Sequence, residues 1–318
     1  MNDLEATSGL SGDAITYVDT LFGGMPPPCP AFEITGVHAL NQGSRRMCTY
    51  RVSAQAPLNL AWHLTLYLPS PLPQSGCPVL LSPDGCWPHV ITPDAIDAVL
   101  AQGVALAFFD RLQLAHDRTD GQRSGPIYSV WPEASWGAVS AWAWGLRQTV
   151  QALRSLAEVD AHQIAVIGHS RGGKAALLAG ASEPDIVLTV SHNSGCAGAA
   201  SFQVKGPEAE TLSQLQAEFP HWLGTDCHDR VARERIEAMD NTALLQSLRG
   251  RHVCVLQAED DLWANPAGTH HAVARLRMDW TAQGWGEHLT HITRTGGHAM
   301  GSIDWSRAAQ ALTRISRR

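Results

Sequence analysis

The sequence predicts an α/β fold with a mainly parallel central sheet and helices on both of its faces. Two observations support this fold class. From residue 79 onward, short apolar runs alternate with longer segments of helical periodicity. One of these runs ends in a glycine-rich turn, Gly168-His169-Ser170-Arg171-Gly172, that opens a helical segment. The alternation predicts parallel pairing, because a helix between two strands returns the chain to the end at which the first strand began.

The strands of the sheet are expected where the short apolar runs occur. Residues 60–68 alternate roughly between apolar and polar side chains, as in a strand with one face less buried than the other. The later runs are mostly continuous, which is typical of parallel strands buried on both faces. They occupy residues 79–81, 104–109, 164–168, 186–190, 253–256 and 289–293.

Helices are expected between these strands. The segments with helical periodicity are 93–102, 136–156, 171–180, 231–248 and 267–283, and a C-terminal helix starts near Asp304 and Trp305. The right-handed crossover rule distributes such helices over both faces and brings the carboxyl ends of the strands to one edge. Functional side chains are therefore expected along that edge.

The 318 residues are expected to form a single domain. With 44% hydrophobic residues the chain can bury a large core, and single α/β domains often reach this length. Residues 1–57 are expected to form an N-terminal extension with early strands, packed on the core of residues 58–318. The proline-rich pieces at 26–30 and 69–73 are expected to be loops.

Charge and hydropathy exclude several classes of protein. The 30 acidic and 23 basic residues give a net charge of −7 without a basic block, so no nucleic-acid partner is expected. The longest stretch without formal charge, 52–83, is interrupted by prolines and polar residues and cannot span a bilayer. The N-terminus has acids where a signal peptide needs basic residues, and it has no apolar stretch. The expectation is a cytoplasmic protein.

The seven cysteines are an odd number, scattered, and form no CxxC pair. This pattern argues against a disulfide framework and against a structural zinc site. The cysteines are expected to be reduced and mostly buried.

The turn at residues 168–172 matches the pattern GxSxG between a buried strand and a helix. In this setting the serine lies on a strained corner, where larger side chains two residues before or after it would collide. The hydroxyl of Ser170 would face the cleft, and the next amide, at the positive end of the helix, would stabilise an oxyanion. Ser170 is the candidate nucleophile, and the fold class narrows to an α/β-hydrolase. A chance match at a glycine-rich corner is the alternative.

A serine hydroxyl is too weak an acid to attack alone, and this fold supplies its partners in the chain order serine, acid, histidine. The chain has 15 histidines. His298 lies in a glycine-bounded loop just after the last predicted strand, where the base belongs. His291 lies inside that strand, and His270 and His271 lie in a helix, so structural roles are expected for them. His298 is the candidate base.

The acid that orients His298 should follow the penultimate predicted strand. Glu259, Asp260 and Asp261 are adjacent there, and three neighbouring carboxylates cannot all point at one imidazole. The usual turn carries its acid three residues beyond a small residue and ends in proline, which selects Asp261. Asp260 is the alternative, and Glu259 is expected to be a solvated loop charge.

Several segments together resemble the bacterial glucuronoyl esterases of carbohydrate esterase family fifteen. In order they are WGAVSAWAWGL, IAVIGHSRGGKAALLAGA, IVLTVSHNSGCAGAA, FPHW, EDDLWANP and GGHAMGSIDW. The likeness covers roughly residues 79–305. It implies cleavage of esters between 4-O-methyl-glucuronic acid on xylan and lignin alcohols, by a serine acyl-enzyme route without metal or cofactor.

The resemblance also implies further site residues. Arg171 would supply its guanidinium and its backbone amide to the oxyanion, together with a second amide near residues 84–87. Lys174 would reach a sugar hydroxyl, with a solvated lysine as the alternative. Trp263 would stack on the sugar ring, with burial in the core as the alternative. Glu210 and Gln216 lie in the region that supplies further sugar contacts.

Three features depart from the family pattern. Asn193 stands where most members have the catalytic glutamate, so the acid role passes to Asp261, as in a minority of the family. His169 stands where fungal members have a cysteine that forms a disulfide, which agrees with a reducing compartment. Members that act on plant walls are secreted, whereas this chain shows no export signal, so native lignin–carbohydrate polymer is not the expected substrate.

Two other functions remain open. An esterase of the same fold could act on acetylated or other small esters inside the cell, because the fold does not determine the acyl group. A catalytically inactive homologue could bind a carbohydrate or a partner. The segment 112–131 could form a wall of the cleft or a disordered excursion, and the oligomeric state is open.

Overall fold

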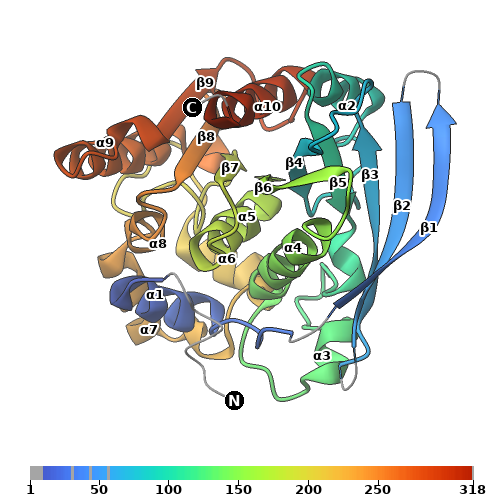
Figure 1. Cartoon of the computed structure of the whole chain (residues 1–318). Coiled ribbons are helices and arrows are strands. Elements are labelled where there is room, and N and C mark those ends of the chain that lie inside the picture. Colours follow the sequence, from blue (N-terminus) through green and yellow to red (C-terminus); the bar gives the residue numbers. More distant parts are fainter. Residues whose placement is uncertain (1–9, 30–31, 43–44, 56–57, 317–318) are drawn as a thin grey trace.

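One mixed sheet organises the fold (Figure 1). In the computed structural model, which describes residues 10–29, 32–42, 45–55 and 58–316, this sheet has nine strands in the order β1-β2-β3-β5-β4-β6-β7-β8-β9. Expectations that concern the first nine residues or residue 30 lie outside the described residues. Chain order and spatial order differ at one point, because β5 lies between β3 and β4.

Six neighbouring strands of this sheet pair in parallel. They are β4 (Cys77–Ser82), β5 (Ala105–Phe109), β6 (Val159–His169), β7 (Leu188–His192), β8 (His252–Ala258) and β9 (Leu289–Arg294). Each includes most of an apolar run of the sequence, and the predicted fold class, a mainly parallel sheet with helices, is confirmed. The carboxyl ends of these strands share one edge, where the loops that follow them meet.

Three antiparallel strands extend the sheet beyond β5. β3 (Ala61–Leu68) corresponds to the predicted alternating strand, and β1 (Phe32–Gln42) and β2 (Arg45–Ala54) are early strands of the N-terminal region. Buried residues alternate along β2, whereas most of β1 is exposed. An exposed edge strand leaves little apolar periodicity in its sequence, which explains why its bounds could not be predicted.

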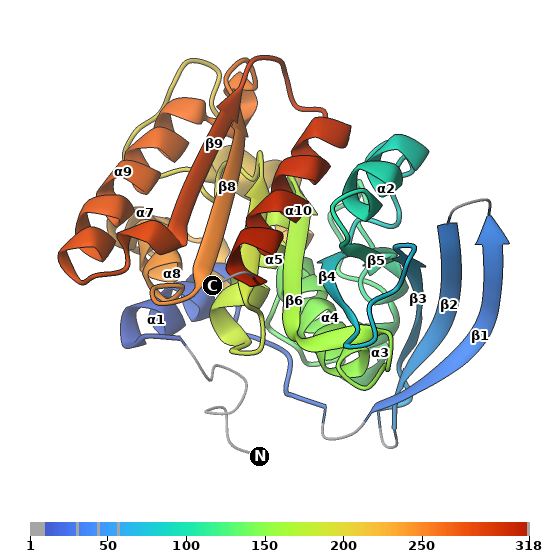
Figure 2. The same ribbon diagram turned by 45° about the horizontal axis from the view of Figure 1, so that its top comes forward.

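Helices cover both faces of the sheet (Figure 2). On one face α2 (Pro93–Leu100) and α10 (Ser302–Ser316) lie side by side and bury Val99 and Trp305 in a core that includes Leu80 of β4. On the other face α4 (Ala138–Leu153) and α5 (Arg171–Ser182) pack on a second core that includes Val79 and Leu81. Successive residues of β4 thus enter different cores, because side chains alternate across a strand.

The segment 231–248, predicted as one helix, forms two. α7 (Arg230–Met239) is followed by its cap residue Asp240, and α8 (Thr242–Gln246) comes next. Asp240 has a φ of 57°, and its carboxylate accepts hydrogen bonds from the hydroxyl of Ser201 at 2.9 Å and from the amide of Phe202 at 2.8 Å. The break between α7 and α8 therefore depends on hydrogen-bond partners that lie 39 and 38 residues earlier in the chain.

Two further helices are long. α9 (Pro266–Ala282) matches its predicted segment, whereas α1 (Gly12–Phe22) was not predicted. α1 begins at the cap residue Ser11 and ends at Gly23, whose φ of 74° suits glycine. The other short α-helices are α3 (Pro126–Val130) and α6 (Leu212–Glu218). The short 3₁₀ helices, labelled η, are η1 (Arg111–Gln113), η2 (Pro220–Trp222), η3 (Thr225–His228), η4 (Leu262–Ala264) and η5 (Gly286–His288).

The segment 112–131 is an ordered part of the structure and not an excursion. The amide of His116 donates to the carbonyl of Ser124 at 2.8 Å, and the amide of Ile127 donates to the carbonyl of Leu114 at 3.0 Å. The indole of Trp142 on α4 donates to the carbonyl of Ala115 at 2.9 Å. These bonds hold the segment against α4.

Among the described residues no helix combines the length and the apolar character needed to cross a membrane. All seven cysteines lie in the described residues and none is part of a disulfide. The buried ones are Cys48, Cys77, Cys196, Cys227 and Cys254.

Candidate active site

Ser170 lies at the corner between β6 and α5. Its φ of 55° and ψ of −119° are unusual for a residue with a side chain. A Cβ atom on Gly168 would lie 2.0 Å from the carbonyl oxygen of Gly172, and a Cβ atom on Gly172 would lie 2.2 Å from Oδ1 of Asp84. Only glycine fits at either position, so both glycines of the GxSxG pattern have a steric reason here.

A buried ion pair between Asp84 and Arg111 contacts the turn that carries Ser170. Oδ2 of Asp84 accepts a hydrogen bond from the amide of His169 at 2.8 Å, and Oδ1 of Asp84 pairs with the guanidinium of Arg111. Arg111 is fully buried, with its guanidinium carbon 4.1 Å from the ring centre of Trp87 and 5.0 Å from that of Trp142. The loop after β4 is thereby attached to the turn that carries Ser170.

The loop at residues 84–87 offers few free amides. The amide of Asp84 donates to Ser82 at 3.2 Å, that of Gly85 to Phe109 at 3.0 Å and that of Trp87 to Asp84 at 2.9 Å. Three of the four amides in the predicted oxyanion segment are therefore occupied within the protein. Cys86 is the remaining candidate there.

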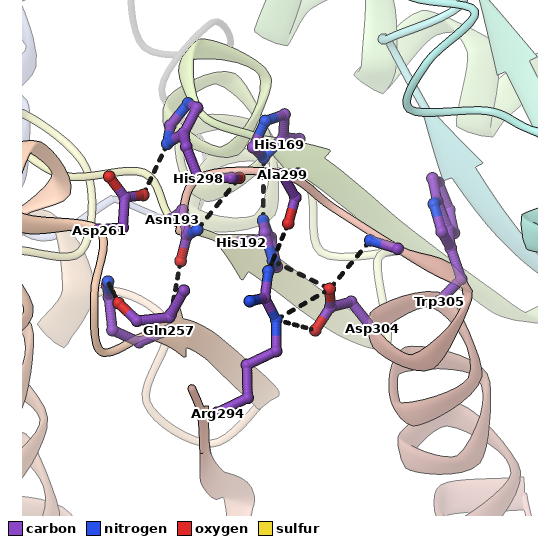
Figure 3. A network of polar contacts seen from close by, with 12 residues as sticks. His169, His192, Asn193, Gln257, Asp261, Arg294, His298, Ala299, Asp304 and Trp305 are labelled. Carbon is purple, nitrogen blue, oxygen red and sulfur yellow. Dashed lines mark hydrogen bonds and ion pairs between the residues drawn. The ribbon is translucent and has the colours of Figure 1, made fainter. Parts of the chain in front are cut away.

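His298 and Asp261 meet across two neighbouring strand ends (Figure 3). Nδ1 of His298 lies 2.6 Å from Oδ2 of Asp261. Asp261 caps η4 after β8, and His298 lies in the loop after the parallel neighbour β9. The side chain of Asp261 is 4% exposed and that of His298 is 45% exposed, so a buried carboxylate orients an accessible imidazole.

The two carboxylates beside Asp261 have other partners. Oδ2 of Asp260 accepts a hydrogen bond from the amide of Gly296 at 2.6 Å. Oε2 of Glu259 lies 3.1 Å from Nε2 of His270. Of these three residues, the structure brings only Asp261, the one selected from the turn pattern, to His298.

Ser170 and His298 line the same cavity, which has a volume of about 100 Å³. Most of the predicted site residues contribute to its wall. The lining residues are Ser170, Arg171, Lys174, Asn193, Ser194, Gly195, Glu210, Phe219, Trp222, Trp263, Ala264 and His298.

Arg171 extends along the wall of this cavity. Its Nη1 donates to Oδ2 of Asp117 at 2.6 Å, and its guanidinium carbon lies 4.5 Å from the ring centre of Trp222. Its Nε is buried and has no hydrogen-bond partner among the described residues. A guanidinium held between a carboxylate and an aromatic ring is a donor with a defined direction.

Asp117 was not identified from the sequence. Its Oδ1 accepts a hydrogen bond from Nε1 of Trp222 at 2.8 Å and lies 3.0 Å from Nε2 of His221. Burial by itself would raise the pKa of Asp117, but the bond from His221 and the charge of Arg171 outweigh it and hold this pKa below its usual range. Asp117 belongs to the segment 112–131, so that segment contacts the site through Arg171, Trp222 and His221, although none of its residues lines the cavity.

Lys174 and Glu210 form a buried pair. Nζ of Lys174 donates to the carbonyl of Ser194 at 2.6 Å and also to that of Cys196, and it lies 3.6 Å from Oε2 of Glu210. Lys174 is 4% exposed and Glu210 is 6% exposed. The alternative of a solvated lysine is therefore wrong.

Trp263 lines the cavity and is 41% exposed, so it is not a core residue. Gln216 does not line the cavity, contrary to the prediction. Its Nε2 donates to the carbonyl of Cys227 and its Oε1 accepts from Nε of Arg233 at 2.9 Å. Gln216 lies on the buried face of α6, with Leu212, and braces that helix against η3 and α7.

Asn193, at the position of the usual family glutamate, contacts the loop of His298. Its Oδ1 accepts a hydrogen bond from the amide of Ala258 at 2.8 Å, and its Nδ2 donates to the carbonyl of His298 at 3.3 Å. The amide thus links β7, β8 and this loop, and it carries no charge.

The sequence analysis also did not identify two buried histidines near His298, His169 and His192, as neighbours of the site. Nδ1 of His169 lies 2.9 Å from Nδ1 of His192, and the ring centre of His169 lies 4.6 Å from that of His298. Burial lowers the pKa of both His169 and His192. His169 could have been noticed because it precedes Ser170, but His192 gives no local signal.

In the part of the chain that the structure describes, no three His, Cys, Asp or Glu side chains gather as metal ligands. The cavity instead combines a hydroxyl at a strained corner, an imidazole paired with a carboxylate, and a guanidinium. This set of groups is suited to nucleophilic attack on a carbonyl carbon with general-base assistance.

Comparison with known proteins bears on this site. A family model described as glucuronyl esterase, fungi, matches residues 75–284. A 4-O-methyl-glucuronoyl methylesterase of Hypocrea jecorina is 31% identical over 207 residues, which is 62% of this chain and 44% of that protein. The carbohydrate esterase MZ0003 of an unknown prokaryotic organism is 32% identical over 188 residues, 54% of this chain and 43% of that protein. The chain thus matches less than half the length of these relatives.

Solved structures share the fold over nearly the whole chain. A glucuronoyl esterase from Solibacter usitatus has a TM-score of 0.80 at 24% identity, covering 95% of this chain and 90% of that one. A carbohydrate esterase family 15 glucuronoyl esterase from Caldicellulosiruptor kristjansonii also has a TM-score of 0.80 at 24% identity, covering 96% and 84%. At this identity the likeness is one of fold.

Proposed function

The chain belongs to the glucuronoyl esterase family, and we propose that it hydrolyses an ester of a uronic acid of the 4-O-methyl-glucuronoyl type. One observation carries the proposal. The imidazole of His298 is 2.6 Å from the buried carboxylate of Asp261 and borders the cavity that Ser170 lines. Nucleophile, base and acid thus come from three different strand ends of one sheet.

In the first half of the reaction the hydroxyl of Ser170 attacks the ester carbonyl. Nε2 of His298 accepts the hydroxyl proton and then returns it to the leaving alcohol, while Asp261 keeps the proton on Nδ1 and stabilises the imidazolium. The products of this half are the free alcohol and an ester between Ser170 and the uronic acid. In the second half a water molecule, activated by His298, attacks that ester and releases the uronate.

The oxyanion that forms in each half needs donors that are already oriented. The backbone amide of Arg171 is the first amide of α5 and has no partner within the helix, because the first amides of a helix lack an acceptor. Its guanidinium, held by Asp117, borders the same cavity. We assign both groups of Arg171 to the oxyanion.

We assign the acyl side of the substrate to the part of the cavity lined by Lys174, Glu210 and Trp263. Lys174 and Glu210 present a charged pair there, and Trp263 exposes 41% of its surface beside it. A cation and a carboxylate together bind adjacent hydroxyl groups, and an exposed indole stacks on the apolar face of a pyranose ring. These three side chains are assigned to the sugar.

The experiment compares hydrolysis of methyl glucuronate by the natural chain, by Ser170→Ala and by Ser129→Ala, an exposed serine outside the cavity. We expect Ser170→Ala to lose about 10⁶-fold in kcat, as loss of a catalytic serine does in a serine protease. Its fold should be unchanged, and Ser129→Ala should match the natural chain. Full activity of Ser170→Ala would refute the nucleophile assignment.

The open alternatives give different outcomes in the same assay. Faster turnover of an aryl acetate than of methyl glucuronate would identify an esterase for small esters. Failure of Ser170 to react with a fluorophosphonate probe, together with no turnover of either ester, would identify a binding protein.

A further inference from the structure

We propose that Arg294, anchored by Asp304, is a positioning residue that holds the loop carrying His298 in its working geometry. The inference rests on the proposed function, in which His298 is the general base. Arg294 is the last residue of β9, and Asp304 lies in the first turn of α10. The loop between them, residues 295–301, contains His298 at its centre.

This loop has little intrinsic rigidity. It contains Gly296, Gly297 and Gly301, and glycine has the largest conformational freedom to lose on folding. A Cβ atom on Gly297 or on Gly301 would meet nothing within 4 Å, so neither glycine is required by close packing. The side chain of His298 is itself 45% exposed. The orientation of the imidazole therefore depends on hydrogen bonds that reach the loop from outside.

Arg294 supplies several of these bonds (Figure 3). Its Nη1 donates to the carbonyl of Thr295 at 3.0 Å, and its Nη2 donates to the carbonyls of Gly297, at 3.4 Å, and Ala299. The last two carbonyls belong to the residues directly before and after His298. A single guanidinium can do this because it carries five donors in a rigid plane.

The loop backbone is shaped around the guanidinium. Gly296 has a φ of 98°, a conformation that favours glycine. A Cβ atom at this position would lie 3.0 Å from Nη1 of Arg294. Glycine at 296 therefore permits both the turn and the close approach of Arg294.

Asp304 fixes the guanidinium from the opposite side. Its Oδ1 and Oδ2 lie 2.9 Å and 3.1 Å from Nε of Arg294, and its Oδ2 also accepts a hydrogen bond from the amide of Gly301 at 3.0 Å. Burial would raise the pKa of Asp304, but the hydrogen bonds from His192, from the amide of Gly301 and from Arg294 outweigh it and the pKa is about 2. Asp304 is therefore an anion at neutral pH and holds both ends of the loop.

The same carboxylate supports the ring beside His298. Nε2 of His192 lies 3.4 Å from Oδ2 of Asp304, and Nδ1 of His192 lies 2.9 Å from Nδ1 of His169. Two ring nitrogens at that distance share one proton, so one of them must be an acceptor. The His169 ring, held in this way, packs 4.6 Å from the ring centre of His298. Asp304 thus positions the loop backbone directly and the neighbouring ring through His192.

The hydrogen bonds that hold the start of the loop 295–301 differ from those that hold its later part. On the side of Asp261, the amide of Glu259 donates to the carbonyl of Arg294 at 2.8 Å, and Asp260 exchanges two hydrogen bonds with Gly296. These bonds reach only the start of the loop. Beyond residue 296, the carbonyls on both sides of His298 depend on Arg294, and the carbonyl of His298 depends on Asn193.

The experiment uses Arg294→Gln, Arg294→Lys and a matched control, Arg275→Gln, an exposed arginine on α9 outside the site. Three readouts are taken for each variant: kcat and KM on methyl glucuronate, the low-field proton resonance of His298 Nδ1–H, and rescue of activity by added guanidinium ion. Loss of the resonance in Asp261→Asn assigns it to the His298–Asp261 bond. Thermal melting shows that each variant is folded.

We expect Arg294→Gln to lose about 100-fold in kcat, because a displacement of about 1 Å costs that much. KM should change little, since Arg294 does not line the cavity. The resonance should be lost in Arg294→Gln and weakened in Arg294→Lys, and guanidinium ion should restore part of kcat in Arg294→Gln. Arg275→Gln should match the natural chain in every readout.

Two results would overturn the inference. One is natural kcat with an unchanged resonance in folded Arg294→Gln. The other is a loss of activity with an unchanged resonance, because Arg294 would then act by another route. If Arg294→Gln does not fold, the resonance of Arg294→Lys decides between the same outcomes. If the natural chain hydrolyses no ester, the proposed function fails, whereas the resonance still tests the positioning of His298 by itself.

Discussion

Asp117 forms an ion pair with Arg171, a residue that lines the active-site cavity, and its Oδ2 lies 2.6 Å from Nη1 of Arg171. The pair joins the segment 112–131 to the first residue of α5. It also holds the guanidinium in one orientation next to the nucleophile, while the guanidinium keeps its positive charge. A developing oxyanion is stabilised well by such a group, because the charge and the donors it meets are already oriented.

Replacing Asp117 should impair catalysis and stability together. We expect Asp117→Asn to lower kcat/KM by up to about 100-fold, since the guanidinium loses its orientation. The free energy of unfolding should fall by about 2 kcal/mol with the loss of charge-assisted hydrogen bonds. Steady-state kinetics and urea unfolding measure both effects. Asp120→Asn is the control: Asp120 pairs with Arg118 in the same segment, both side chains are exposed, and little change is expected.

The neighbouring acids Asp261 and Asp260 should respond differently to the same substitution. We expect Asp261→Asn to lower kcat by about 10⁴-fold, as that type of change does in a serine protease, because the imidazole loses its orienting carboxylate. Asp260→Asn should have a much smaller effect, since Asp260 bonds the amide of Gly296 and not His298. Single-turnover measurements with an aryl ester compare the two variants. A silent Asp261→Asn with an inactive Asp260→Asn would reverse the assignment.

The glycine after Arg171 should tolerate no side chain. In Gly172→Ala the new Cβ atom would lie 2.2 Å from Oδ1 of Asp84, which is buried and held by Arg111. We expect a loss of about 3 kcal/mol in the free energy of unfolding, as overpacking of a rigid site produces. Gly12→Ala, where a Cβ atom meets nothing within 4 Å, serves as the control and should be neutral or slightly stabilising. Equal stability of Gly172→Ala and the natural chain would contradict the close packing of Gly172 on Asp84.

Acidification below about pH 6.5 should destabilise the fold through His291. Burial and the charge of His270 lower the pKa of His291 from 6.5 to about 4, whereas Glu259 acts in the opposite direction. Between these two values the unfolded chain binds the proton and the folded chain does not, so stability falls as pH decreases from about 6.5 and is retained above it.

We expect His291→Gln to reduce this slope by up to about 1.4 kcal/mol per pH unit, the value for one proton. Urea unfolding at a series of pH values between 7 and 4 measures the slope. The exposed His271 provides the control variant, His271→Gln. An unchanged slope in His291→Gln would show that His291 takes up its proton equally in the folded and unfolded chains.

Local patterns were sufficient for much of the architecture. Alternation predicted β3, apolar runs predicted β4 to β9, and helical periodicity predicted α2, α4, α5 and α9, because the faces that a strand or helix buries repeat along its own sequence. The single predicted helix at 231–248 failed where Asp240 takes hydrogen bonds from Ser201 and Phe202. No window of local sequence contains those partners.

For the candidate site too, some residues could be predicted from local sequence and others could not. The sequence by itself determined the candidate nucleophile Ser170 and the candidate base His298, because each is marked by a short pattern next to a predicted strand. The turn pattern also favoured Asp261 over Asp260, and the tertiary structure brings Asp261 to the imidazole. Only the tertiary structure decided that Lys174 is buried against Glu210 and that Gln216 faces away from the cavity. It also brought Asp117, Arg294 and His192 to the site. These contacts join loops that are distant in the chain and adjacent only at the carboxyl edge of the folded sheet, so no local pattern encodes them.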